Sequence, residues 1–314
     1  MSTKPGEKDL SGFVFDIQGM SVHDGPGCRT LIFLNGCTLN CFWCSNPEGI
    51  SRNPQFLYFE NKCIACFNCM EACPEKRITV RDGKPVFNRK FCLNCNDTQC
   101  LSVCYTDALK YSGSKMTVKQ LMQIVQRDRQ FWGSNGGVTL TGGEPLLQID
   151  FAEELLRCCH EAYIHTAIET CGNVPARNFE RVLPWLDWIF FDLKHFGPAE
   201  HKEATGVDNR LILENARRVS AQFGERLVFR LPLIPGFNDT RSNLDALIGF
   251  LKECGRNEIN ILPLHHLGRE KYNLLGREYK GMNYPVPDAD AVNGVKDYLE
   301  TNGLQCYTGG DTPF

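Results

Sequence analysis

Three cysteines lie close together near the start of the chain, in the stretch CTLNCFWC. Cys37, Cys41 and Cys44 are separated by three residues and then by two, with no fourth cysteine close by. A structural zinc site uses four ligands, and an electron-carrying 4Fe–4S cluster also takes four thiolates. Three thiolates therefore predict a 4Fe–4S cluster with one iron open to another ligand. The alternatives are a zinc site with a distant fourth ligand, or three buried thiols.

Two longer runs of cysteines follow. The first, CIACFNCMEACP, has the C-x2-C-x2-C-x3-C-P spacing of bacterial ferredoxins, and the second, CLNCNDTQCLSVC, is two residues longer. In ferredoxins the fourth cysteine of each run binds the other cluster. The runs therefore predict two more 4Fe–4S clusters, with a pair of zinc sites as the alternative. One cluster would use Cys63, Cys66, Cys69 and Cys104, and the other would use Cys73, Cys92, Cys95 and Cys100.

The distribution of cysteines favours metal binding over disulfide bonds. The chain has 17 cysteines, and most of them lie between Cys28 and Cys104 instead of evenly along the sequence. Tight CxxC spacings in a cytosolic chain indicate metal ligands. The cysteines without such spacing are expected to be small buried apolar residues: Cys28, Cys158, Cys159, Cys171, Cys254 and Cys306.

Composition excludes several classes of protein. The 314 residues carry a net charge of −3, with no basic stripe for nucleic acid and no polybasic patch for a membrane surface. No apolar run approaches membrane-spanning length, and the polar start MSTKPGEKDLSG lacks the apolar segment of a signal peptide. We expect a soluble, cytoplasmic, monomeric protein of one large α/β domain or two smaller ones.

Helical and strand patterns alternate after residue 114, whereas residues 51–114 are rich in cysteines, prolines and short turns. The alternation predicts a parallel sheet, and the cysteine-rich part predicts a small inserted module. Expected helices, from their apolar spacing, span 117–132, 151–162, 176–186, 209–223, 240–255 and 288–303. Expected strands span 12–20, 29–37, 136–145, 165–172, 187–196, 226–236, 258–268 and 304–310.

Glycines and polar residues stand where several expected strands end. The carboxyl ends of parallel strands are where functional residues gather. One such residue alone is usually just solvated or hydrogen-bonded, but their placement at successive strand ends predicts a shared site. The residues are Gly142, Gly143, Glu144, Glu169, Thr170, Asp192, Lys194, Arg230 and His265.

The three-cysteine loop together with TGGEP resembles the radical SAM superfamily. The resemblance implies that S-adenosylmethionine binds the open iron through its amino and carboxylate groups, and that the reduced cluster cleaves it to a 5′-deoxyadenosyl radical. It also implies a partial (β/α)6 barrel with an inserted ferredoxin-like two-cluster domain. The barrel would comprise residues 12–50 and 115–314, the insertion 51–114, and a flexible terminus 1–11.

The same resemblance assigns roles to the strand-end residues. Gly142, Gly143 and Glu144 match the motif that holds the amino group of S-adenosylmethionine, because glycines admit a close ligand and a carboxylate suits an ammonium. Asp192 and Lys194 match a D-x-K motif that contacts the methionine carboxylate or an adjacent monovalent cation. The other expected pocket residues are Trp43, Glu169, Thr170, Arg230 and His265, of which His265 would line the adenosine.

The segment SVHDGPGCRT resembles one subfamily, the activating enzymes of glycyl radical enzymes. In that subfamily an aspartate lies near the glycine loop of the partner, a role that would fall to Asp24. The implied activity is removal of the α-hydrogen of a glycine in the C-terminal loop of the partner enzyme, in an anaerobic organism. A low-potential donor such as flavodoxin or ferredoxin would supply the electrons.

Several segments, among them FDIQGMSVHDGPGCRTLIFLNGC and GVDNRLILEN, look closest to activators of 4-hydroxyphenylacetate decarboxylase. Activators of choline trimethylamine-lyase, glycerol or diol dehydratase, and isethionate sulfite-lyase share the layout and remain alternatives. An enlarged ferredoxin-type electron carrier would have only fully ligated clusters. A radical SAM enzyme acting on a small molecule or RNA would not need the DGPG segment. The insertion clusters could relay electrons, stabilise the fold or dock a partner.

Overall fold

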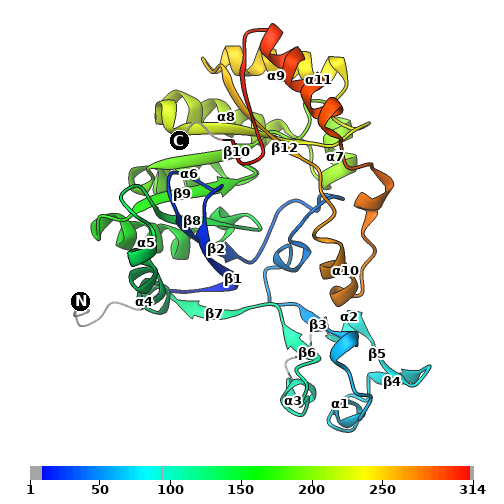
Figure 1. Ribbon diagram of the computed structural model, residues 1–314. Helices are drawn as coiled ribbons and strands as arrows, with labels where there is room; N and C mark the ends of the chain where they lie inside the picture. The colour runs from blue at the N-terminus through cyan, green and yellow to red at the C-terminus, as the bar shows by residue number, and fades with distance from the viewer. Residues whose placement is uncertain (1–8, 93–94, 96, 312–314) are drawn as a thin grey trace.

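The computed structural model describes residues 9–92, 95 and 97–311 (Figure 1). The expected flexible terminus, residues 1–11, falls mostly outside this range. In the part of the chain that is described, no helix combines the length and the apolar character needed to cross a bilayer.

A nine-stranded sheet organises most of the described chain. From β2 to β13, the strands of this sheet are parallel and follow one another in sequence order. The parallel sheet predicted from the alternation of helices and strands is therefore confirmed. Its parallel strands are β2 (Arg29–Leu34), β8 (Gly137–Gly142), β9 (His165–Thr170), β10 (Trp188–Asp192), β11 (Leu227–Leu233), β12 (Glu258–Pro263) and β13 (Gln305–Thr308).

Two antiparallel strands extend the sheet beyond β2. β1 (Ser11–Ser21) pairs with β2, and β7 (Ser114–Thr117) pairs with β1. The strand order among the described residues therefore ends at β13 on one side and at β7 on the other. The sheet is curved and has an edge at each end (Figure 1), which agrees with the expected partial barrel.

Helices connect the parallel strands and lie along the outer side of the curved sheet (Figure 1). They bury one apolar face each, as α5 does with Phe151, Leu155 and Cys159. α4 begins at a capping box in which Thr117 and Gln120 exchange hydrogen bonds. The helices are α4 (Val118–Asp128), α5 (Ile149–Glu161), α6 (Ala176–Val182), α7 (Pro198–Thr205), α8 (Arg210–Phe223), α9 (Arg241–Glu253) and α11 (Ala289–Thr301).

The cysteine-rich segment forms a small module on one side of the sheet (Figure 1). Its core is apolar and holds Phe56, Ile78, Phe87 and Leu109. Two short antiparallel ladders and three single-turn helices build it, in agreement with the absence of any long helical pattern. The elements are β3 (Phe56–Tyr58), α1 (Asn68–Glu71), β4 (Ile78–Arg81), β5 (Lys84–Phe87), α2 (Arg89–Cys92), α3 (Gln99–Ser102) and β6 (Leu109–Tyr111).

Helix α10 (Arg269–Leu275) joins this module to the three-cysteine loop. Tyr272 Oη donates to the carbonyl oxygen of Cys44 at 3.0 Å. Just after the helix, Arg277 Nη2 donates to Gln55 Oε1 at 2.9 Å. The sequence analysis did not predict α10 or α7; α10 buries only Tyr272 and Leu275 among its seven residues.

Candidate active site

A cavity of about 500 Å³ lies against the carboxyl ends of the parallel strands. Its lining brings together residues that are far apart in the sequence. All of the predicted barrel-site residues except Glu144 contribute to the wall: Asp24, Cys37, Cys41, Trp43, Cys44, Gly142, Gly143, Glu169, Thr170, Asp192, Lys194, Arg230 and His265.

The three-cysteine loop follows β2 directly and faces this cavity. Backbone N–H groups approach two of its sulfurs: Leu39 N lies 3.4 Å from Cys37 Sγ, and Asn46 N lies 3.4 Å from Cys44 Sγ. Hydrogen bonds to sulfur are a feature that tunes iron–sulfur sites. Burial raises the pKa of Cys44 to about 12, so the free thiol is protonated at neutral pH. Binding of a metal would release this proton, because the thiolate is the ligand. The three thiols and the N–H groups beside them fit the chemistry of an iron–sulfur ligand set.

The GGE turn after β8 packs against the cysteine loop. A Cβ atom on Gly143 would lie 2.1 Å from the carbonyl oxygen of Gly36 and 2.7 Å from that of Gly49. Gly142 has a φ of +111°, a conformation that favours glycine. The glycines were expected to admit a close ligand. The structure shows a second reason for them, the contact between two backbone loops.

Glu144 departs from its expected place on the cavity wall. Its side chain is fully buried, and its carboxylate accepts hydrogen bonds from Thr170 Oγ1 (2.8 Å), Cys171 N (2.8 Å) and Leu146 N (3.1 Å). Burial raises its pKa above the usual range, against these hydrogen bonds. The carboxylate therefore ties the GGE turn to the end of β9, and the glycine backbone is the part of the motif that faces the cavity.

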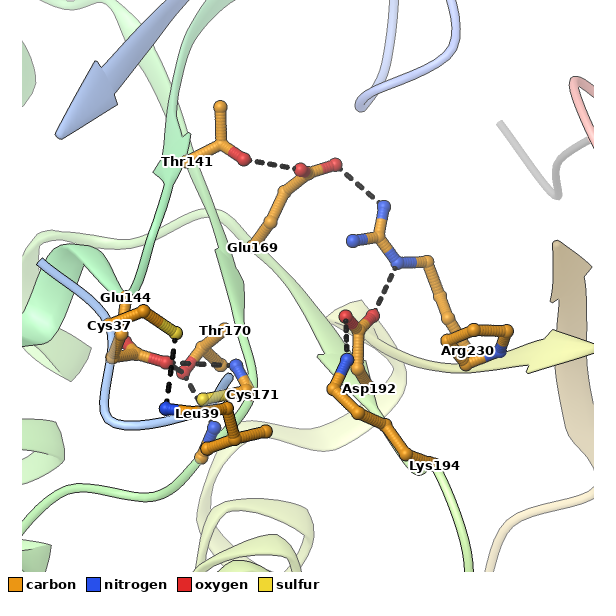
Figure 2. A network of polar contacts seen from close by, with 12 residues as sticks. Cys37, Leu39, Thr141, Glu144, Glu169, Thr170, Cys171, Asp192, Lys194 and Arg230 are labelled. Atoms are coloured by element: carbon orange, nitrogen blue, oxygen red, sulfur yellow. Dashed lines mark hydrogen bonds and ion pairs between the residues drawn. The ribbon is translucent and has the colours of Figure 1, made fainter. Parts of the chain in front are cut away.

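Four charged side chains form a chain of ion pairs along the cavity (Figure 2). Glu169 Oε1 lies 2.6 Å from Arg230 Nη1, and Arg230 Nε lies 3.0 Å from Asp192 Oδ1. Asp192 Oδ2 then lies 2.9 Å from Lys194 Nζ. At the other end, Thr141 Oγ1 donates to Glu169 Oε2 at 2.6 Å. Side chains from four neighbouring strands, β8 to β11, are thus fixed relative to one another.

The charges of Asp192, Lys194 and Arg230 stabilise one another despite their burial, whereas burial raises the pKa of Glu169 above its usual range in spite of Arg230. Burial opposes ionisation of Asp192, but Lys194 and Arg230 outweigh it and hold the pKa of Asp192 below its usual range. Burial also opposes the charge on Lys194, yet Asp192 raises its pKa above the ordinary value. Both side chains are therefore charged at neutral pH.

Asp24 reaches the cavity from the opposite direction. Its DGPG turn precedes β2, at the amino end of the parallel strands, and Ser21 Oγ donates to Asp24 Oδ2. The carbonyl oxygen of Asp24 accepts from Thr139 Oγ1 at 2.7 Å. A carboxylate from this turn and the ion pairs at the strand ends thus line one cavity.

Arg29, which the sequence analysis did not single out, holds this turn in place. Its fully buried guanidinium donates to Pro26 O at 2.9 Å, to Val138 O at 2.7 Å and to Thr139 Oγ1 at 2.7 Å. Burial lowers the pKa of Arg29 to about 10, so it stays charged at neutral pH. The sequence does not reveal that Arg29 is buried, because its partners Val138 and Thr139 lie in another strand.

Aromatic and thiol groups complete the wall. Trp43 is buried, with its ring centroid 5.5 Å from that of Phe237, and His265 is exposed at the mouth. Cys171, expected as a buried apolar residue, is buried, and the neighbouring Cys37 thiol together with this burial raises its pKa. The other expected buried cysteines divide: Cys159 and Cys306 are buried, whereas Cys28, Cys158 and Cys254 are only partly buried.

Two smaller cavities in the cysteine-rich module each meet four predicted ligands. One is lined by Cys63, Cys66, Cys69 and Cys104, and the other by Cys73, Cys92, Cys95 and Cys100. This is the exchanged grouping that the ferredoxin spacing predicts. Ala65 and Phe67 adopt φ values of 56° and 58°, and alternating left-handed residues of this kind form backbone nests at iron–sulfur sites. Among the described residues, no three metal-ligating side chains converge as around a single ion.

Comparison with known proteins agrees with this geometry. Residues 94–248 match the Radical SAM superfamily, and residues 56–105 match the 4Fe-4S dicluster domain. A radical SAM methyltransferase from Sphaerobacter thermophilus superposes with a TM-score of 0.53 at 16% identity, covering 89% of this chain and 66% of its own. That likeness concerns the fold alone.

Relatives with much higher identity extend over almost the whole chain. The 4-hydroxyphenylacetate decarboxylase activating enzyme of Clostridioides difficile is 42% identical, over 98% of this chain and 99% of its own. The indoleacetate decarboxylase activating enzyme of Tractidigestivibacter scatoligenes is 42% identical (95% and 97%), and the isethionate sulfite-lyase activating enzyme of Desulfovibrio desulfuricans is 40% identical (93% and 94%). The chain belongs to the radical SAM superfamily and, within it, to the activating enzymes of glycyl radical enzymes.

Proposed function

We propose that this chain generates the glycyl radical of an arylacetate decarboxylase. The observation that carries the proposal is the shared cavity, in which an open three-cysteine loop, a buried ion-pair chain and the Asp24 carboxylate meet. Two of the relatives described above activate arylacetate decarboxylases, and the resemblance in the sequence points the same way. Isethionate sulfite-lyase is the alternative partner, because its activator is nearly as similar.

Different residues of the cavity would hold the cluster and S-adenosylmethionine. When bound, a 4Fe–4S cluster and S-adenosylmethionine supply the 5′-deoxyadenosyl radical that takes the glycine α-hydrogen. Cys37, Cys41 and Cys44 would hold the cluster, and the backbone of Gly142 and Gly143 would receive the amino group. Lys194 uses one of its three ammonium hydrogens on Asp192, so it is suited to the methionine carboxylate, alone or with a monovalent cation beside Asp192.

The remaining residues position the reacting groups. Trp43 and His265 would flank the adenosine. The ion pair of Glu169 and Arg230 would keep the cavity wall in place between S-adenosylmethionine and the glycine loop. Asp24 lies in the DGPG turn, which Arg29 holds in place. Its carboxylate, a good acceptor for backbone N–H groups, would receive the glycine loop. Hydrogen transfer between carbon atoms needs no protein base, so this chain contributes orientation and exclusion of water.

The cysteine-rich module, residues 51–114, would carry two further 4Fe–4S clusters that relay electrons from a low-potential donor to the barrel, residues 12–50 and 115–314. The grouping of four thiols around each of its two cavities supports this role. In this proposal the protein acts as a cytoplasmic monomer under anaerobic conditions.

A partner panel tests the proposal. The reconstituted protein is reduced and mixed with S-adenosylmethionine and, separately, 4-hydroxyphenylacetate decarboxylase, indoleacetate decarboxylase or isethionate sulfite-lyase. We expect a glycyl radical doublet by EPR with an arylacetate decarboxylase and a yield at least tenfold lower with the sulfite-lyase. The reverse order would overturn the partner assignment.

A further inference from the structure

A carboxamide without a hydrogen-bond partner lies in the wall of the barrel cavity. Asn260, in β12, is only 2% exposed, and its Oδ1 accepts no hydrogen bond from any described residue. It also lines the cavity, although none of the roles given above to the cavity residues involves it. Buried side-chain oxygens are hydrogen-bonded in most proteins, so an exception at a substrate cavity needs an explanation.

The alternation of side chains along β12 turns Asn260 toward the cavity. Successive side chains of a strand point to opposite faces of the sheet. Ile259 and Ile261 belong to the apolar core that the sheet shares with the helices, whereas Asn260 and Leu262 line the cavity. A ligand in the cavity is therefore on the correct side of the sheet to supply the missing hydrogen bond.

Position along the strands shows which end of the cavity Asn260 faces. The cysteine loop begins after the carboxyl end of β2, and His265 follows the carboxyl end of β12. Asn260 lies inside β12, in register with Arg230 and closer to the amino ends of the strands, where the DGPG turn precedes β2. It is thus on the side proposed for the glycine loop, away from the cysteines.

The turn after β13 connects the surroundings of Asn260 to those of Asp24. Gly309 N donates to the carbonyl oxygen of the next residue of β12 at 2.9 Å. A Cβ atom on Gly310 would lie 2.5 Å from His23 Nδ1, and His23 precedes Asp24 in the chain. All five of these residues line the cavity. A Cβ atom on Gly309 would meet nothing within 4 Å, so the space beside this turn is open.

The chemistry of a carboxamide suits a peptide backbone. Its oxygen accepts a hydrogen bond from an N–H group, and its NH2 group donates to a carbonyl oxygen. Rotation about the Cβ–Cγ bond is soft and exchanges the two ends, so either end can be presented to a ligand. A peptide group offers both complementary atoms, and the glycine loop of the partner is a peptide.

We propose that Asn260 is a second positioning residue for the glycine loop, and that its carboxamide pairs with a peptide group of that loop. The inference rests on the proposed function, in which this cavity admits the glycine loop. Asp24 and Asn260 come from different parts of the barrel, so together they fix the direction in which the loop crosses the cavity. One α-carbon of the loop is then presented to the deoxyadenosyl carbon in preference to its neighbours.

Peptide binding tests the proposal without any reaction. Synthetic peptides with the glycine-loop sequences of the three candidate partners carry a fluorophore, and fluorescence anisotropy follows their binding to the reconstituted full chain, with S-adenosylmethionine and no reductant. Asn260→Leu keeps a branched side chain but removes its hydrogen-bonding atoms, and we expect it to weaken peptide binding at least tenfold. Asn257→Leu, the same change at an exposed position just before β12, should bind as the wild type does.

N-methylated peptides distinguish direct pairing from an indirect effect. Each peptide of a series carries one N-methyl group, which removes one backbone N–H donor. At one position, methylation should weaken binding to the wild type at least tenfold but binding to Asn260→Leu less than twofold, since residues in contact have non-additive effects. The melting temperature of Asn260→Leu should not fall, because the Oδ1 atom that it removes has no partner within the protein.

The outcomes separate the residue from the function. Equal peptide affinities of wild type and Asn260→Leu, additive effects of methylation at every position, or no peptide binding by the wild type would overturn the proposal. A loss of S-adenosylmethionine affinity in Asn260→Leu, measured by equilibrium dialysis, with unchanged peptide affinity would assign the carboxamide to the nucleoside instead. Wild-type protein that forms no 5′-deoxyadenosine with dithionite contradicts the proposed function, whatever the peptide affinities.

Discussion

At the scale of single residues, the contact between the GGE turn and the cysteine loop predicts a sharp effect of one methyl group. Gly143→Ala would place its Cβ against the carbonyl oxygens of Gly36 and Gly49, forcing the two loops apart. We predict that the variant loses the barrel cluster, about four iron atoms per chain, and keeps the module clusters. Iron analysis and EPR measure this.

The control for that substitution is Gly249→Ala in α9, where a Cβ meets nothing within 4 Å. Alanine favours a helix over glycine by roughly 0.5–1 kcal/mol, so this variant should keep all its iron and unfold at slightly higher denaturant. Full iron content in Gly143→Ala would show that the loops can separate without releasing the ligands.

The ion-pair chain predicts a second effect, on stability. Arg230→Met would leave Glu169 and Asp192 nearly buried without their shared cation. Breaking a buried pair from one side costs about 3–5 kcal/mol, whereas the exposed pair of Arg217 and Glu253 is screened by water and should contribute little. Denaturant unfolding of Arg230→Met and Arg217→Met compares the two. Equal losses in the free energy of unfolding would mean that water screens the ion pairs of Arg230.

At the scale of elements, a buried arginine and a half-buried histidine join the start of β2 to the start of β9. Arg29 Nη1 lies 3.2 Å from His165 Nδ1, which accepts as a neutral imidazole. Burial, and then the charge of Arg29, lower the pKa of His165 to about 4. Unfolded histidine titrates near 6.5, so the unfolded chain binds more protons between these values. Stability therefore falls as the pH is lowered from about 6.5 to 4.

His165→Gln tests this linkage. When the pH is lowered from 7 to 5, the melting temperature should fall less in the variant than in the wild type, because glutamine does not titrate. His160→Gln, at an exposed position in α5, should lose as much as the wild type does. If all three proteins respond alike to pH, His165 does not remain neutral in the fold.

Local patterns explain how much of these elements the sequence could predict. Apolar spacing identifies α5 or α8 without any tertiary information, and the cysteine spacing indicates which thiols share each cavity in the module. The packing of Gly143 on Gly36 and Gly49 joins loops more than 90 residues apart in the chain. The inward turn of Glu144 depends on Thr170 and Cys171, which follow in the next strand of the sheet. Arg29 is an arginine whose burial only the assembled sheet reveals. Those features could not be predicted from periodicity or spacing.

At the scale of the whole molecule, two parts of the chain would have separate functions. The barrel cavity would hold S-adenosylmethionine and the glycine loop, and the cysteine-rich module would carry two further clusters. Helix α10 and the residues just after it contact both the Cys44 loop and the module, so they join the two parts. The central claim beneath this arrangement is that the barrel cavity brings a glycine α-carbon to the deoxyadenosyl carbon.

Isotope transfer measures that claim most directly. An arylacetate decarboxylase is produced with α-deuterated glycine and incubated with the reduced protein and unlabelled S-adenosylmethionine, and the 5′-deoxyadenosine is analysed by mass spectrometry. The account predicts one deuterium in each 5′-deoxyadenosine, matched by a glycyl radical signal. Formation of 5′-deoxyadenosine without deuterium, and without a radical on the partner, would contradict it.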